Sequence, residues 1–190
     1  MEQINLLALS GSLRKASYNT AAIQALKALA PGNVEIVIGE ISDLPLFNPD
    51  REDENIPALN KLKSELNAAS GLIISSPEYA HGISGPMKNT LDWLVSGEEF
   101  PYVPIMLINT STRASHALEA LKEVLRTMAG NVIEESFVSI PLLGSGLDAT
   151  GIVSDRQLAA TLKTGLDVFV DEIKKGQTRL RIQLNTEILE

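Results

Sequence analysis

Short apolar runs alternate with amphipathic helical patterns along most of the chain, and this alternation is the strongest constraint on its fold. The apolar runs predict buried strands at residues 4–9, 34–38, 72–74, 103–108 and 132–138. Apolar residues between them recur at three- and four-residue spacing, as in Leu59, Leu62 and Leu66, which predicts helices that cover the sheet. Five strands alternating with five helices predict an α/β fold, a three-layer sandwich around a parallel sheet.

Composition narrows the classes of function. The 190 residues fit one domain, and no apolar run reaches transmembrane length. The chain begins directly with a strand pattern, so we expect no signal peptide. It has no cysteine, which excludes disulfides and thiolate chemistry and fits a reducing cytoplasm. A net charge of −8 without a long basic cluster disfavours nucleic acid and anionic membranes as partners. His81 and His116 give no metal signature.

A polar loop follows the first strand directly, and a helical pattern follows the loop. Gly11 lets the backbone turn tightly there. The first N–H groups of a helix lack internal partners and lie at the positive end of the helix dipole, which suits a phosphate. The loop is neither a P-loop nor a G-x-G-x-x-G motif. An ordinary connection with Ser17 as N-cap is the alternative that this motif leaves open. The polar side chains are those of Ser10, Ser12, Arg14, Ser17, Asn19 and Thr20.

Two more unusual loops follow the third and fourth strands, at residues 75–85 and 109–113. The carboxyl ends of parallel strands share one edge of the sheet, where ligands bind at the point of strand-order reversal. The loop 75–85 has glycines and backbone amides that suit a flat ring, and Pro86 then opens a helix. A phosphate on the first loop and a ring on the second would be a mononucleotide, either a flavin or a nucleoside phosphate.

Several short motifs, taken in order, resemble the NADPH-dependent FMN reductase family over residues 4 to about 130. The resemblance implies a flavodoxin-like fold with a five-stranded parallel sheet in the order 2-1-3-4-5. The motifs are Gly11-Ser12-Leu13-Arg14 with Ser17 and Asn19, Leu44-Pro45-Leu46-Phe47, Ser76-Pro77-Glu78-Tyr79, Lys88-Asn89 and Asp92-Trp93.

The resemblance also implies where FMN binds. Around the phosphate it places Ser10, Ser12, Arg14, Ser17, Asn19 and Thr20. Along the isoalloxazine it places Pro77, Glu78, Tyr79, Ala80, His81 and Gly82, with Ser111 and Arg113 at the other edge. Arg113 would stabilise negative charge on the reduced ring. The chain departs from the family at Ala80, where many members have asparagine, at Ser84, where proline is usual, and at residues 111–116, which lack glycine.

The implied activity is transfer of hydride from NADPH or NADH through bound FMN to a small acceptor, with ping-pong kinetics at one shared site. The acceptor would be a quinone, free flavin, azo compound or chromate. Because the chemistry occurs on FMN, we expect no catalytic side chain and no metal. The family implies a homodimer or homotetramer. The alternatives are a flavodoxin-type one-electron carrier, a flavin-free nucleotide-binding enzyme, and a domain that keeps the fold without the ligand.

Three segments carry further expectations. Residues 1–176 are interpreted as the FMN-binding domain and residues 177–190 as a C-terminal tail. Residues 179–184 alternate polar and apolar side chains, so the tail would be an edge strand, an arm onto a partner subunit, or disordered. The apolar loop Leu44–Phe47 is expected to pack against a partner or the flavin site, and Trp93 is expected in the core.

Overall fold

The computed structural model describes residues 3–111, 113 and 115–187. The predicted parallel sheet is confirmed in the order β2-β1-β3-β6-β7, and β8 also pairs with β6. The strands are β1 (Ile4–Ser10), β2 (Val34–Ile38), β3 (Gly71–Ser75), β6 (Pro104–Asn109), β7 (Asn131–Val132) and β8 (Val138–Ser139). Each pair of neighbours runs parallel, as β1 does with β2 and β3.

The strand expected over residues 132–138 differs from the prediction. A 3₁₀ turn, η2 (Glu134–Ser136), divides it into β7 and β8. The Glu134 carboxylate accepts hydrogen bonds from Lys122 Nζ at 2.7 Å and Arg126 Nη2 at 2.9 Å. The buried Ser136 hydroxyl donates to the Ile133 carbonyl at 2.8 Å. These bonds stabilise the turn, so the edge of the sheet has two short strands instead of one.

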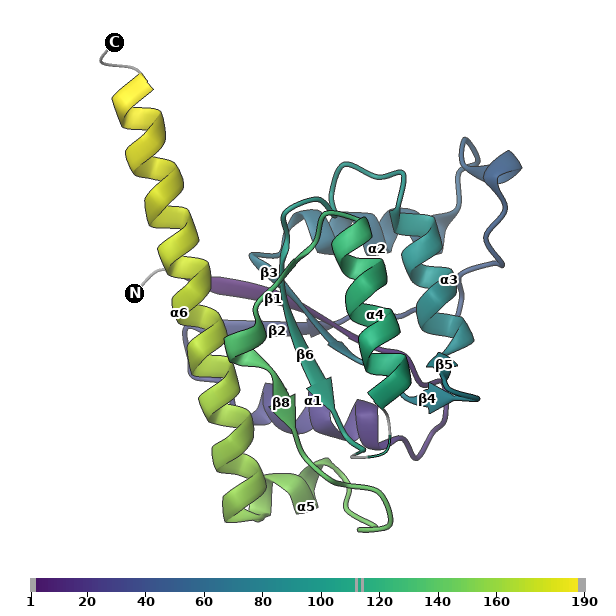
Figure 1. Ribbon diagram of the computed structural model, residues 1–190, viewed down its shortest axis with the longest axis vertical. Helices are drawn as coiled ribbons and strands as arrows, with labels where there is room; N and C mark the ends of the chain where they lie inside the picture. Colours follow the sequence, from purple (N-terminus) through teal and green to yellow (C-terminus); the bar gives the residue numbers. More distant parts are fainter. Residues whose placement is uncertain (1–2, 112, 114, 188–190) are drawn as a thin grey trace.

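Helices cover both faces of the sheet, which confirms the three layers (Figure 1). On one face lie α1 (Tyr18–Leu29), α5 (Ala149–Ser154) and α6 (Arg156–Glu187). On the other lie α2 (Pro57–Asn67), α3 (Gly85–Leu94) and α4 (Ser115–Thr127). A 3₁₀ turn, η1 (Pro49–Arg51), precedes α2, and a hairpin of β4 (Glu78–Tyr79) and β5 (Gly82–Ile83) precedes α3. The short α5 begins directly after Asp148, whose side chain caps it.

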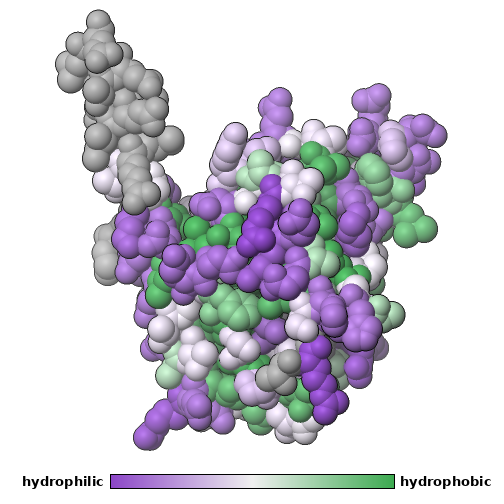
Figure 2. Space-filling model, viewed as in Figure 1, coloured by the Kyte–Doolittle hydropathy of each residue, from purple (hydrophilic) through white to green (hydrophobic). Residues whose placement is uncertain are grey.

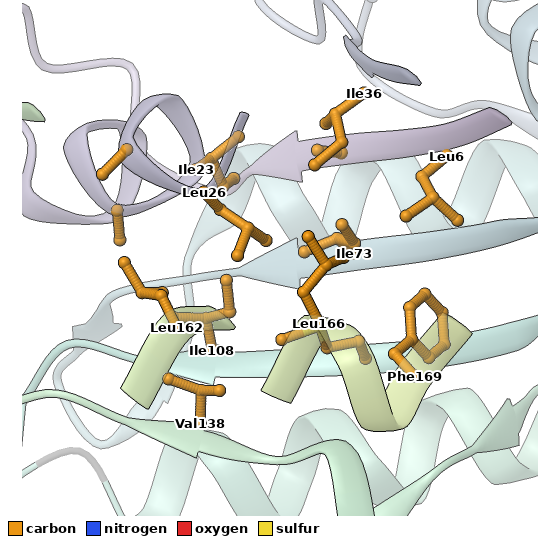
Figure 3. Close-up of a cluster of buried hydrophobic side chains, with 14 of the residues drawn as sticks. Leu6, Ile23, Leu26, Ile36, Ile73, Ile108, Val138, Leu162, Leu166 and Phe169 are labelled. Atoms are coloured by element: carbon orange, nitrogen blue, oxygen red, sulfur yellow. The ribbon is translucent and has the colours of Figure 1, made fainter. Parts of the chain in front are cut away.

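Side chains of each central strand alternate between two cores. Leu6 and Ala8 point to the α1/α6 side, and Leu7 and Leu9 point to the α2/α3/α4 side. Figure 3 shows the first core, in which α6 places its apolar stripe beneath the strands. β3 begins with glycine because α6 approaches closely there: a Cβ on Gly71 would lie 2.8 Å from the ring of Phe169.

The C-terminal segment is helical, so the expectation of an edge strand or a disordered tail is wrong for the described residues up to 187, whereas an arm onto a partner subunit stays a prediction. α6 continues through residues 179–184 as part of one helix. Residues 177–187 contain neither proline nor glycine and are mostly good helix formers, and packing of the preceding turns against the sheet fixes the start of the helix. The division at residue 176 stays a prediction.

The apolar loop Leu44–Phe47 packs on α3 of its own chain, and packing of its exposed part against a partner stays a prediction. The Asn89 side chain accepts the Phe47 N–H at 2.8 Å and donates to the Pro45 carbonyl at 2.9 Å. Trp93 Nε1 donates to the same carbonyl at 2.8 Å, and its ring meets Phe47 edge-to-face at 5.1 Å. Trp93 is buried in the core, as predicted. Leu46 alone in this loop points outward, 83% exposed.

The face of the molecule in Figure 2 has hydrophilic and hydrophobic areas side by side. None of the helices described here combines the length and apolarity needed to cross a membrane.

Candidate functional site

A cavity of about 310 Å³ opens at the carboxyl edge of β1, β3 and β6. We call it the edge cavity. Its walls come from the three loops that the sequence singled out, together with the start of α1 and Leu143 of the loop after β8. It is lined by Ser12, Arg14, Ala16, Ser17, Tyr18, Asn19, Ser76, Pro77, Glu78, Tyr79, Asn109, Thr110, Ser111, Arg113 and Leu143.

The loop from β1 to α1 forms one end of this cavity. Ser17 caps α1, and its side chain accepts the Thr20 N–H at 3.3 Å. Ser12 Oγ accepts the Arg14 N–H at 3.4 Å, which shapes the loop so that Arg14 is exposed beside the opening. Ser10 Oγ and Thr20 Oγ1 bond to each other at 2.8 Å, and neither residue is among those that line the cavity.

Glycine is required at position 11 because a side chain there would have no space. The sequence pattern instead predicts a tight turn of the backbone there. The described residues with positive φ do not include Gly11. Its N–H donates to the Ser75 carbonyl at 2.8 Å, and its carbonyl accepts the Ser84 hydroxyl at 2.6 Å. A Cβ on Gly11 would lie 2.3 Å from Ser76 Oγ. The first loop is therefore packed directly against the start of the second.

Asn19 joins the first turn of α1 to the ends of two strands. Its Oδ1 accepts the Thr110 hydroxyl at 3.2 Å and lies 2.9 Å from the Ser75 hydroxyl. The Ser75 hydroxyl shares its proton with the Ile108 carbonyl at 3.0 Å. All three side chains are buried. This network holds the floor of the edge cavity rigid, because it links the ends of β3 and β6 to α1.

The hairpin β4–β5 forms the opposite end of the cavity. Its turn places Ala80 at φ 50° and His81 at φ 60°, the left-handed region that a type I′ hairpin requires at both central positions. Glu78 Oε2 accepts the Ala117 N–H in the first turn of α4 at 2.9 Å. Its Oε1 lies 3.1 Å from His81 Nδ1. The hairpin is thereby attached to the start of α4.

These contacts lower the pKa of the Glu78 carboxyl. The largest cause is the Ala117 backbone N–H, which stabilises the carboxylate. Burial opposes it by raising the pKa, and the electrostatic effects of the neighbouring His81 and His116 lower the pKa by smaller amounts. The two imidazole rings meet edge-to-face at 4.7 Å between centroids. Glu78 is therefore a fixed anion that holds the hairpin in place, with little freedom to act as an acid.

The loop after β6 supplies the side wall. The Ser111 N–H donates to Asn109 Oδ1 at 3.0 Å, and the Arg113 N–H donates to Ser111 Oγ at 3.3 Å. Arg113 is exposed and lines the cavity. Thr112 and Ala114 lie outside the described residues.

Most predicted site residues line the edge cavity, and five do not. Ser10, Thr20, Ala80, His81 and Gly82 lie outside its lining. For these five, as for the residues that do line the cavity, the assignment as FMN contacts stays a prediction. The sequence prediction missed six lining residues, of which Asn109 and Thr110 carried a signal as polar residues at a strand end. Leu143 carried none, because its loop enters from beyond β8. The other three are Ala16, Tyr18 and Ser76.

The edge cavity favours an organic anion over a metal ion. Its charged lining residues in the described structure are Arg14, Arg113 and Glu78, and Glu78 is already bound to α4. Across the described ranges, no group of three or more histidines or acids is arranged to hold a metal ion.

Comparison with known proteins gives consistent matches. The family model described as NADPH-dependent FMN reductase matches residues 4–142. An NAD(P)H-dependent FMN reductase of Pseudomonas aeruginosa is 29% identical over 182 residues, covering 91% of this chain and 98% of the relative. A quinone reductase of Escherichia coli is 34% identical over 118 residues, covering 58% of this chain and 61% of the relative.

A solved structure has the same arrangement of layers. FerB, a flavoenzyme NAD(P)H:(acceptor) oxidoreductase from Paracoccus denitrificans, superposes with a TM-score of 0.76 at 28% identity. The match covers 90% of this chain and 98% of FerB.

Proposed function

The chain belongs to the NADPH-dependent FMN reductase family, and we propose that it oxidises NAD(P)H and reduces a quinone or similar small acceptor at FMN bound in the edge cavity. The observation that carries this proposal is the pairing of two different ends in one cavity. One end has hydroxyls, a helix start and a guanidinium; the other has the hairpin β4–β5, held by Glu78.

The first end fits a phosphate. Ser12, Ser17 and the amides at the start of α1 supply hydrogen-bond donors, and Arg14 supplies a cation that can grip two oxygens. Arg14 makes no salt bridge within the described part of the chain. Its charge is therefore available to a ligand, in a protein whose net charge is −8.

The second end fits a planar ring. Pro77 and Tyr79 give it apolar and aromatic surface, and Tyr79 remains 49% exposed at the opening. The backbone here is fixed on three sides, by the contact of Ser84 with Gly11, by the hairpin turn and by the Glu78–Ala117 bond. Such a fixed surface orients a ring without rearranging when it binds.

When bound, FMN supplies the redox chemistry, accepting hydride from NAD(P)H and passing two electrons to the acceptor. The protein's own residues bind FMN, orient its ring and leave room for the donor and the acceptor. Arg113 and the neighbouring backbone place positive potential beside the ring end. Glu78 supports the hairpin. The exposed Tyr79 and Leu143 border an opening where donor and acceptor can take turns.

The visible spectrum of the purified protein tests this proposal. We expect a yellow protein, or apo-protein that takes up FMN in equimolar amount, whose absorbance near the flavin band is lost on anaerobic addition of NADPH or NADH. Initial rates with a quinone should give parallel double-reciprocal lines, because one site serves both substrates. A colourless protein that does not bind FMN would contradict the proposal, and intersecting lines would contradict the shared site.

We also propose that the protein is a cytoplasmic homodimer or homotetramer. The absence of cysteine fits a reducing compartment. Leu46 exposes apolar surface that a second copy could cover. Light scattering after gel filtration would test the oligomeric state, and a monomer at micromolar concentration would contradict it.

A further inference from the structure

A second cavity of about 330 Å³ adjoins the edge cavity on the other side of the segment Arg14–Tyr18. We call it the adjoining cavity. Arg14, Ala16, Ser17 and Tyr18 line both cavities. Its further walls come from α1 and from the loop that leads into α5, two helices that pack against each other (Figure 1). The residues that line it alone are Lys15, Thr20, Ala21, Gln24, Gly146, Leu147, Asp148 and Ala149.

The floor of the adjoining cavity is fixed. The Gly146 N–H donates to the Tyr18 hydroxyl at 3.0 Å, which holds the loop against α1. Gly146 has φ +71°, a conformation that suits glycine. Asp148 Oδ1 accepts the Gly151 N–H at 2.8 Å as the cap of α5. Both walls are therefore positioned before any ligand binds.

The segment that lies between the two cavities carries two cations, Arg14 and Lys15, more than one bound phosphate would contact. Lys15, like Arg14, is exposed and makes no salt bridge within the described part of the chain. One phosphate on Ser12, Ser17 and Arg14 leaves Lys15 over the adjoining cavity. A diphosphate would use both cations, the first phosphate at the edge cavity and the second at Lys15.

The remaining walls suit an adenosine. Ala21, Leu147 and Ala149 offer apolar surface for a purine face. Gln24 can donate to and accept from a purine edge, and the Asp148 carboxylate can accept from ribose hydroxyls or an exocyclic amine. The volume lies within the range of small-molecule sites, roughly 300–1,000 Å³.

We propose that the adjoining cavity binds the adenylyl half of FAD, so that this protein accepts FAD as well as FMN. FAD is FMN extended at its phosphate by AMP, and the two cavities meet at the segment that would hold that phosphate. The inference rests on the proposed flavin in the edge cavity. It adds a ligand class and a second set of residues to that function.

The test titrates apo-protein with riboflavin, FMN and FAD, following the quenching of flavin fluorescence. We expect FAD to bind within about threefold of FMN, or more tightly, because the adjoining cavity compensates for the ordering of the AMP half. Gln24→Trp fills that cavity from an exposed position on α1. It should weaken FAD about tenfold and leave FMN unchanged, as expected for losing one well-made contact. Lys15→Ala should weaken FAD more than FMN.

Lys27→Ala, on an exposed turn of α1 outside both cavities, is the matched control and should change neither affinity. Wild-type FAD affinity a hundredfold below that of FMN would overturn the proposal, as would Gln24→Trp leaving FAD affinity unchanged. If that variant instead raises the KM for NADPH or NADH in FMN-loaded protein, the cavity serves the adenosine of the nicotinamide donor and the FAD assignment is wrong. If no flavin binds, the proposed function itself fails and takes this inference with it.

Discussion

Arg14 lies at the junction of the two cavities, exposed and without a carboxylate partner among the described residues. Ser12 lies two residues before it and is buried. A buried hydroxyl and an unpaired guanidinium side by side are typical of an anion site, because each would gain a charged partner on binding.

Arg14→Ala is expected to raise the FMN dissociation constant tenfold to a hundredfold, since a hydrogen bond to a charged group contributes about 1.5–3 kcal/mol. Ser12→Ala should raise it about tenfold by the same argument. Fluorescence titration measures both. Riboflavin, which lacks the phosphate, should bind equally to all three proteins. Arg51→Ala, on a surface turn paired with Glu54, is the matched control. An unchanged FMN affinity would remove both residues from the phosphate site.

Glu78 connects the hairpin to α4, and its charge makes that connection depend on pH. Its pKa is lowered in the folded protein, chiefly by the Ala117 N–H. A lowered folded pKa adds stability above the unfolded pKa, and this stability is lost as pH falls through the folded value. The contribution is therefore complete at neutral pH and disappears in acid, below the usual range of a glutamate.

Glu78→Gln is expected to lower the free energy of unfolding at pH 7 and to lose this difference from wild type progressively in acid. The amide keeps an acceptor for the Ala117 N–H, so the variant isolates the charge. Urea unfolding at several pH values from 7 downward measures the difference. Glu98→Gln, on an exposed loop, is the control. A difference from wild type that stays constant with pH would show that Glu78 acts through shape alone.

At the scale of elements, side chains far apart in the sequence fasten loops to helices. Asn89 and Trp93 of α3 hold the loop Leu44–Phe47 through its backbone. The loop motif Leu44–Phe47 and the two motifs on α3, more than forty residues further along the chain, are thus one structural unit. In this loop the Leu46 side chain is exposed to solvent, while side chains of α3 form hydrogen bonds with the backbone of Pro45 and Phe47.

Asn89→Ala is expected to cost about 1–3 kcal/mol of stability, because it leaves the Phe47 N–H without its acceptor. Chemical denaturation measures the loss. Asn60→Ala removes an exposed side-chain bond to Asn55 and should cost less than 0.5 kcal/mol, the usual range for surface substitutions. Equal losses of stability in the two variants would show that the hydrogen bonds from Asn89 to the loop Leu44–Phe47 contribute no more than an exposed surface bond.

At the scale of the whole molecule, one sheet separates two cores that must fold together. Phe169 is buried in the core beneath α6, and Trp93 is buried in the core on the opposite face. Since Trp93 is the only tryptophan in the sequence, its fluorescence reports one layer while substitutions can perturb the other.

Phe169→Ala is expected to destabilise the protein by about 3–5 kcal/mol, the usual cost of a large cavity. The Trp93 emission shift and the loss of far-UV circular dichroism should coincide in one transition, although the change lies in the other core. Lys163→Ala, exposed on the same helix, should have little effect. Two separated transitions would mean that the layers unfold independently.

The sequence predicted most of the fold because its strands are apolar on both faces and its helices carry clear stripes. Strand order, layer assignment and the burial of Trp93 followed from these patterns and from the family motifs. The hairpin at Ala80 and His81 was missed, since its turn lacks the asparagine and glycine that usually mark one. The pairing of Ser10 with Thr20 was missed because a hydroxyl's partner depends on three-dimensional proximity. Leu143 reaches the cavity through a loop whose path no local pattern sets.

The turn that divides the last sheet position into β7 and β8 has a consequence for colloidal behaviour. An uninterrupted outer strand would present a row of unpaired backbone N–H and C=O groups, with which a strand of another chain could pair. Here each piece is two residues long, and the acidic pair Glu134 and Glu135 lies between them. Fibre growth by strand addition at that border is thereby discouraged, even at the high concentrations at which a yellow enzyme would be stored.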